Sequence, residues 1–214
     1  MRDNRRAGQC LLIGILLPLV ILGLHPTAHD LTADSGTRIT AINHFVHGIA
    51  LASQPLLVVG LIGLTGYLGW SLPATGGLVV YGFSVVATMT AALMSGFVAS
   101  DVIAQLRVEA PATAGQYQAL LHYTGYLNQA FAKVSVLAAG LALVLWSLDI
   151  ARTRRLPRLT AVTGIVAGLA LTLGILLGQL VLNVQGIIIA TAIQAVWMAL
   201  VAVQLQRVPP AAPE

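Results

Sequence analysis

Six long runs of apolar residues dominate the chain, and each is about as long as a bilayer-spanning helix. They cover residues 7–24, 42–70, 76–103, 119–148, 159–182 and 187–205. About 20 apolar residues in a helix cross the hydrocarbon core of a bilayer, and the strict alternation of a barrel strand is not seen. Only 8% of the residues are charged, against about 25% in soluble domains. The sequence therefore predicts an all-α, polytopic transmembrane helical bundle of about six spans.

The basic residues gather on one side of this predicted topology. That side holds eight of the 11 lysines and arginines, namely Arg2, Arg5, Arg6, Arg152, Arg154, Arg155, Arg158 and Arg207. The opposite side has Arg38 and Arg107, and Lys133 lies within the fourth run. Because basic loops stay in the cytoplasm, we expect both termini to be cytoplasmic, in a bacterial-type inner (plasma) membrane. The same placement accounts for the net charge of +4 without a nucleic-acid partner.

The basic segment RTRRLPR, residues 152–158, is the best boundary within the chain. We expect residues 1–150 to form a four-span part and residues 151–208 to form a basic loop and a terminal helical pair. Residues 209–214 are rich in proline and predict a disordered tail. Basic residues before the first run are also typical of a cleaved signal peptide. We favour a retained helix, because residues 25–30 match the small-x-small pattern of a cleavage site poorly.

Histidines cluster on the side of the membrane opposite to the basic loops. His44 and His47 are three residues apart, so they share one face of a helix. His47 precedes Gln54 by seven residues, and His122 precedes Gln129 by seven residues. Each His and Gln pair therefore lies on one helix face, about 10 Å apart. This repeated spacing predicts that His47 and His122 face each other across the bundle.

Two kinds of ligand fit such a cluster. Facing imidazoles of His47 and His122 would ligate a haem iron, as in haem b. Alternatively, His44, His47 and His122 would bind zinc or copper, with Asp101 as a fourth ligand, a supporting group or a base. Histidines also occur at membrane–water interfaces for structural reasons, and they titrate close to neutral pH. The metal or haem site, the structural role and the proton sensor are therefore the three interpretations of this cluster.

A second polar set lies within the predicted spans. Lys133 follows His122 by 11 residues and shares a helix face with Gln129. It lies near the middle of its run, where an ammonium is costly, and no Asp or Glu lies in the core of any run. We expect Gln54, Gln129 and Gln179 to solvate Lys133 along a polar pathway. Glycines at positions 60, 63, 66, 164 and 168 predict close helix contacts.

Three functions follow from these patterns. The leading hypothesis is an integral membrane protein that binds a transition metal or haem at an outer-face histidine cluster, for redox chemistry or metal handling. The alternatives are a small-solute, ion or proton transporter around Lys133 and a non-catalytic subunit of a membrane complex. The expected partners are the lipid bilayer and either further copies of the chain or other subunits. Phosphate-binding loops, HExxH and Gly-x-Ser-x-Gly are absent from the sequence, so no enzymatic reaction is assigned.

Overall fold

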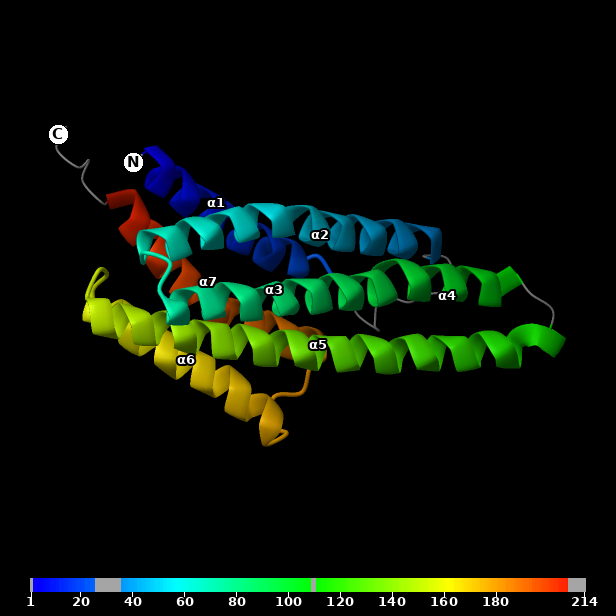
Figure 1. Ribbon diagram of the computed structural model, residues 1–214. Helices are drawn as coiled ribbons and strands as arrows, with labels where there is room; N and C mark the ends of the chain where they lie inside the picture. The colour runs from blue at the N-terminus through cyan, green and yellow to red at the C-terminus, as the bar shows by residue number, and fades with distance from the viewer. Residues whose placement is uncertain (1, 26–35, 109–110, 208–214) are drawn as a thin grey trace.

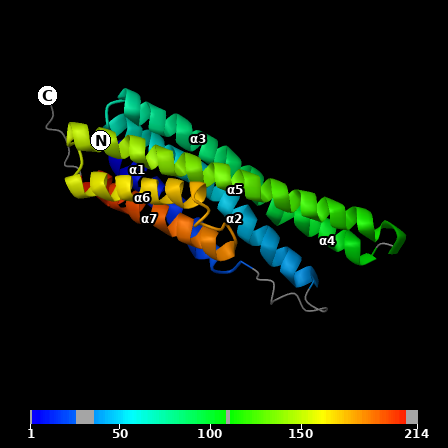
Figure 2. The same ribbon diagram turned by 90° about the horizontal axis from the view of Figure 1, so that it is seen from below.

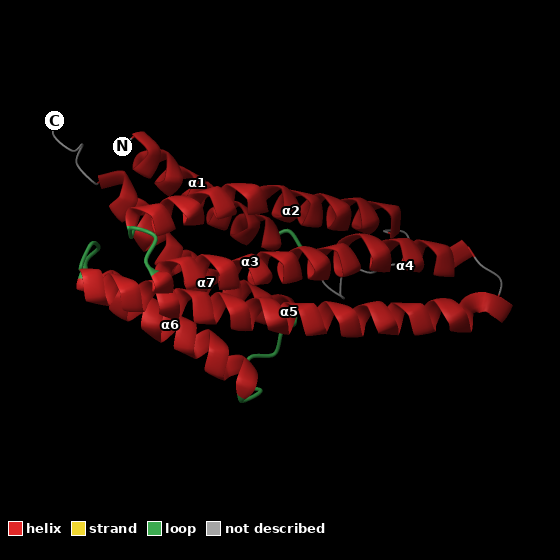
Figure 3. Ribbon diagram, viewed as in Figure 1, coloured by secondary structure: helices red, strands yellow, loops and turns green. Residues whose placement is uncertain are grey.

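The computed structural model describes residues 2–25, 36–108 and 111–207, and these ranges are helical with short loops (Figure 3). The helices are α1 (Arg2–Leu22), α2 (Gly36–Tyr67), α3 (Leu72–Leu93), α4 (Ala99–Val108), α5 (Pro111–Thr153), α6 (Arg158–Leu176) and α7 (Val184–Arg207). One π-helical turn, η3 (Met94–Val98), joins α3 to α4. Counting α3, η3 and α4 as one, the described ranges contain six helices long and apolar enough to span a membrane. The all-helical, multi-pass part of the prediction is therefore confirmed.

The two ends of the bundle differ. We call the end at which α1 begins and α7 ends the terminal end, and the α2–α3 and α5–α6 loops also lie there (Figure 1). At the opposite end, which we call the histidine end, α2, α4 and α5 extend beyond α1, α6 and α7 (Figures 1 and 2). Helix length explains this shape, because the 43 residues of α5 span about 64 Å and the 19 residues of α6 about 28 Å.

Glycines allow the helices to approach closely. α1 packs along α2 and α7, and α5 packs along α3 and α6. A Cβ atom added to Gly60 would lie 2.6 Å from the backbone nitrogen of Leu11, and one added to Gly14 would lie 2.6 Å from that of Leu57. Close packing was predicted for Gly60, Gly63, Gly164 and Gly168 and is confirmed, whereas Gly66 faces only the ring of Trp70, at 3.6 Å.

The main apolar core is centred on aromatic side chains. Trp146 of α5 stacks on Trp197 of α7 with ring centroids 6.0 Å apart, and it also contacts Tyr81 of α3. Leucines of α1 and α2 and Ala161 of α6 belong to the same core. Both predicted parts, residues 1–150 and 151–208, contribute to this one core, and their division stays a prediction. The predicted tail, residues 209–214, lies outside the described residues.

Asp149 is buried within the terminal end. α5 continues to Thr153, beyond the predicted end of the run at residue 148, so Asp149 belongs to the helix. Its side chain is 0% exposed, and neither carboxylate oxygen has a hydrogen-bond partner among the described residues. Asp149 lies in the last turns of α5 and outside the core of the predicted run, so the expectation that no acidic residue lies in the core of a run is not contradicted by it. Trp146, one turn away on α5, lies against Gly77 of α3.

Candidate functional site

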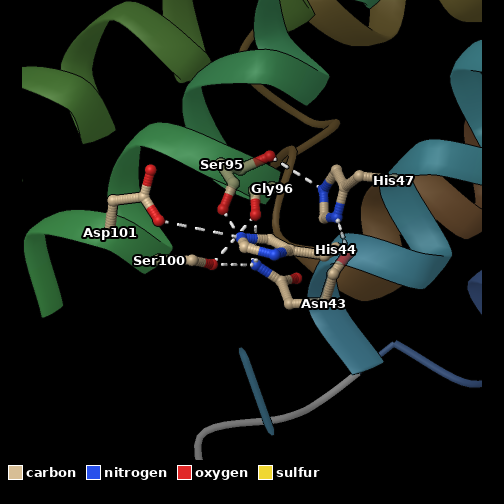
Figure 4. Close-up of polar contacts among 7 residues, drawn as sticks. All are labelled: Asn43, His44, His47, Ser95, Gly96, Ser100 and Asp101. Carbon is tan, nitrogen blue, oxygen red and sulfur yellow. Dashed lines mark hydrogen bonds and ion pairs between the residues drawn. The ribbon is translucent and has the colours of Figure 1, made fainter. Parts of the chain in front are cut away.

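Polar side chains of α2 meet the π turn at the histidine end (Figure 4). We call this group the histidine site, and it consists of Asn43, His44 and His47 of α2, Ser95 and Gly96 of η3, and Ser100 and Asp101 of α4. His25 follows the end of α1, and its ring contacts the ring of His47 with centroids 5.2 Å apart. The site therefore lies where the long helices extend beyond α1.

Asn43 fixes the π turn against α2. A π turn disturbs the regular pairing of backbone groups, and carbonyl groups inside a membrane protein need partners. The side-chain amide of Asn43 donates to the carbonyl oxygens of Ser95, at 3.0 Å, and Gly96, at 3.2 Å. It also donates to Ser100 Oγ at 2.7 Å. One side chain thus satisfies both carbonyl groups, and single π turns of this kind are frequent at functional sites.

His47 is held by hydrogen bonds at both ring nitrogens. Its Nδ1 lies 2.9 Å from the carbonyl oxygen of Asn43, and because a carbonyl only accepts, Nδ1 carries a proton. Its Nε2 lies 2.9 Å from Ser95 Oγ. A Cβ atom at Gly96 would clash with this ring, so glycine is required there. These contacts direct Nε2 of the buried His47 toward η3.

His44 offers a ring nitrogen that has no partner. Its ring stacks on Phe97, with centroids 5.0 Å apart and planes 13° apart. Nε2 is buried and forms no hydrogen bond with any described residue. Asp101 Oδ1 lies 4.0 Å from this nitrogen, at the outer limit for an ion pair, and the Asp101 side chain is 75% exposed. Because buried polar atoms are nearly always satisfied, an unpaired imidazole nitrogen beside a carboxylate is the feature of this site that most suggests a ligand.

The predicted ligands are only partly brought together. His44, His47 and Asp101 meet in the histidine site, whereas the His122 side chain is exposed on α5 and is not part of this group. Within the described ranges, no group of three or more His, Cys, Asp or Glu side chains is arranged to hold one metal ion. His29 lies outside the described residues. Asn43 and Ser95 were missed by sequence reasoning, although the four-residue spacing of Asn43 and His47 was a usable signal.

The predicted polar pathway is dispersed over the bundle. Gln54 is buried and donates to the carbonyl of Ala50 in its own helix, at 3.3 Å. Gln129 donates to the carbonyl of Leu182 at 2.9 Å, and Gln179 is exposed and donates to that of Leu177. Lys133 is also exposed. No hydrogen bond among the described residues joins these four side chains, and the pathway stays a prediction.

Comparisons with protein-family models, with curated proteins and with solved structures found no match for this chain. The functional argument therefore starts from the chemistry of the histidine site. That site combines imidazole nitrogens, one exposed carboxylate and two hydroxyl groups, all at the histidine end of a bundle whose helices are long and apolar enough to span a membrane. Imidazole and carboxylate together are a ligand set for divalent transition metals.

Proposed function

We propose that this multi-pass membrane protein binds a divalent transition metal ion, of the zinc or copper kind, at the histidine site and takes part in metal handling. The observation that carries the proposal is the buried, unpaired Nε2 of His44, which faces Asp101 Oδ1 across 4.0 Å. Zinc bonds to nitrogen and oxygen measure about 2.0–2.2 Å, so two ligand atoms of a tetrahedral site lie roughly 3.4 Å apart, and Asp101 Oδ1 would have to move closer to His44 Nε2 than its present 4.0 Å. The ion fits with only a small movement of the exposed Asp101 side chain.

His47 and His25 would supply further ligands. A metal-binding histidine usually donates its second ring N–H to a carbonyl or carboxylate, which fixes the tautomer and directs the other nitrogen to the metal. The hydrogen bond from His47 Nδ1 to Asn43 has this form. His25 packs against His47. In the described residues these side chains are not arranged to hold one ion, so binding would require His47 Nε2 to leave Ser95 Oγ and the other ligands to move toward His44.

The same geometry favours a bare ion over haem. Haem ligation by His47 and His122 needs both imidazoles to face one macrocycle. His122 is exposed, whereas His47 is buried with its ring against Gly96, which leaves no room for a flat macrocycle on that side. Haem binding stays an untested prediction, and the purified protein is expected to be colourless.

Metal binding is tested by titrating the purified, full-length protein with Zn²⁺, and with Co²⁺ as a coloured probe. We expect one ion per chain, and we expect His44→Ala to weaken binding on the order of 100-fold or more, since even loss of a supporting group weakens metal binding 10- to 100-fold. His122→Ala is the matched control, because it removes an exposed histidine from the same end of the bundle, and it should bind as the wild type does.

Equal loss of binding in both variants, or a wild-type protein that binds neither ion, would refute the proposed site. A Soret band in the purified protein that disappears in His122→Ala would instead support haem. Correct folding of each variant is checked by size-exclusion chromatography before titration.

We further propose that the terminal end faces the cytoplasm of a bacterial-type inner membrane. Support comes from the basic residues, because the start of α1, the end of α5, the start of α6 and the end of α7 carry most of the arginines. A reporter enzyme that is active only outside the cytoplasm should be active when fused after Thr113 and inactive when fused after Arg154. The reverse pattern would place the histidine site in the cytoplasm.

A further inference from the structure

Lys133 lies on α5 close to the level at which the short helices α6 and α7 meet their connecting loop. It precedes Thr153, the last residue of α5, by 20 residues, or about 30 Å of helix, which is the thickness of the hydrocarbon core. Gln129, one turn nearer the histidine end, bonds to Leu182 in the loop between α6 and α7. Lys133 is therefore level with the ends of the short helices, beyond which the first part of α5 extends (Figure 1). We infer that one boundary of the hydrocarbon layer lies at this level.

Exposed tyrosines support this position. Tyr126 is 76% exposed and Tyr123 is 59% exposed, and both lie on α5 between Lys133 and the histidine end. Tyr126 precedes Lys133 by seven residues, so the two side chains share a helix face about 10 Å apart. Tyrosine is enriched at membrane–water interfaces, where its ring meets apolar chains and its hydroxyl meets headgroups. The face of α5 that carries Lys133 thus has the composition of an interface.

The ammonium of Lys133 has no counterion among the described residues. Its side chain is exposed, and in the part of the chain that the structure describes, no carboxylate forms an ion pair with it. A lysine at the edge of the hydrocarbon layer extends its ammonium toward the headgroups. The group that meets it there is a lipid phosphate, which lysine binds as a point charge.

An apolar groove begins next to Lys133 and runs toward the terminal end. It has a volume of about 410 Å³ and is lined by Val80 and Phe83 of α3, by Val134, Leu137, Ala138 and Leu141 of α5, and by Thr172 of α6. Leu137 lies one helical turn from Lys133 on the same face of α5. The eight residues from Val134 to Leu141 cover about 10 Å along the helix axis, which is enough for part of an acyl chain.

We propose that Lys133 and this groove bind one anionic phospholipid from the leaflet at the histidine end. The phosphate lies on the ammonium, and one acyl chain lies in the groove between α3, α5 and α6. Charge complementarity favours a lipid with net negative charge over a zwitterionic one, because the single protein charge at the site is positive. This site is independent of the metal site, since the two share no residue.

The test places a photo-reactive phenylalanine derivative at Leu141, inside the groove, in the full-length protein. The protein is reconstituted in vesicles of equal parts phosphatidylglycerol and phosphatidylcholine, and cross-linked lipids are identified by mass spectrometry. We expect phosphatidylglycerol to be enriched about fivefold, the factor contributed by one basic residue near an anionic lipid. The enrichment should vanish with Lys133→Gln and persist with Lys133→Arg.

A matched control places the same photo-reactive residue at Val162 of α6, which is 57% exposed and does not line the groove. No lipid preference is expected there. Equal labelling of the two lipids at Leu141, or enrichment that survives Lys133→Gln, would overturn the proposal. Cross-links to a second copy of the chain in place of lipid would also overturn it, because the groove would then be a contact between subunits.

Discussion

Replacement of Trp146 by alanine will lower the free energy of unfolding by about 3–5 kcal/mol, the usual effect of emptying a buried tryptophan site. Trp146 is 0% exposed and stacks on Trp197 with centroids 6.0 Å apart. Its ring also lies against Gly77, where an added Cβ would come within 2.9 Å of it. The substitution therefore leaves a cavity among α2, α3, α5 and α7, and it removes the hydrogen bond from Trp146 Nε1 to Thr65 Oγ1.

The measurement is denaturant unfolding in mild detergent micelles, followed by circular dichroism. Trp70→Ala is the matched control, because Trp70 is 56% exposed at the loop between α2 and α3. We expect a change within about 0.5 kcal/mol for this control, as for most surface substitutions. Similar losses in the two variants would show that Trp146 does not lie in the common core.

The number of spans could be predicted because it depends on local properties. A helix in lipid must satisfy its own backbone, so a long apolar run alone predicts a span. The π turn at Met94–Val98 could not be predicted in this way. Its carbonyls are satisfied by Asn43, which is more than 50 residues away in sequence, and no local pattern reveals such a partner.

In the candidate site, too, features that depend on spacing along one helix could be predicted, whereas contacts between residues far apart in sequence could not. Spacing along α2 correctly places His44 and His47 together in the histidine site. The matched spacing of His47–Gln54 and His122–Gln129, however, does not correspond to matched surroundings. His47 is buried and His122 is exposed, and Gln54 bonds within its own helix while Gln129 bonds to Leu182 of the α6–α7 loop. A repeated spacing along a helix predicts the depth of each side chain and the helix face on which it lies. It does not predict which neighbouring helix or loop packs against that face.

Gly60→Ala will destabilise the contact between α1 and α2. The added Cβ would lie 2.6 Å from the nitrogen and 2.7 Å from the Cα of Leu11. These are backbone atoms, so the strain is relieved only if the two helices move apart. Overpacking of this kind costs up to about 3 kcal/mol, and alanine recovers about 1 kcal/mol through its higher helix propensity. We therefore expect the free energy of unfolding to fall by about 2 kcal/mol, since the overpacking strain exceeds the propensity gain.

Gly82→Ala, in the same bundle, is expected to raise the free energy of unfolding. Gly82 lies inside α3, and a Cβ added there meets no atom within 4 Å. Only the propensity gain remains, so this variant should be more stable than the wild type by about 0.5–1 kcal/mol. The same unfolding assay in micelles compares the two variants. Both variants change one glycine to alanine within a predicted span, so they differ only in the surroundings of the glycine. If both changed the free energy of unfolding in the same direction, the close approach of Gly60 to Leu11 would not be what holds α1 and α2 together.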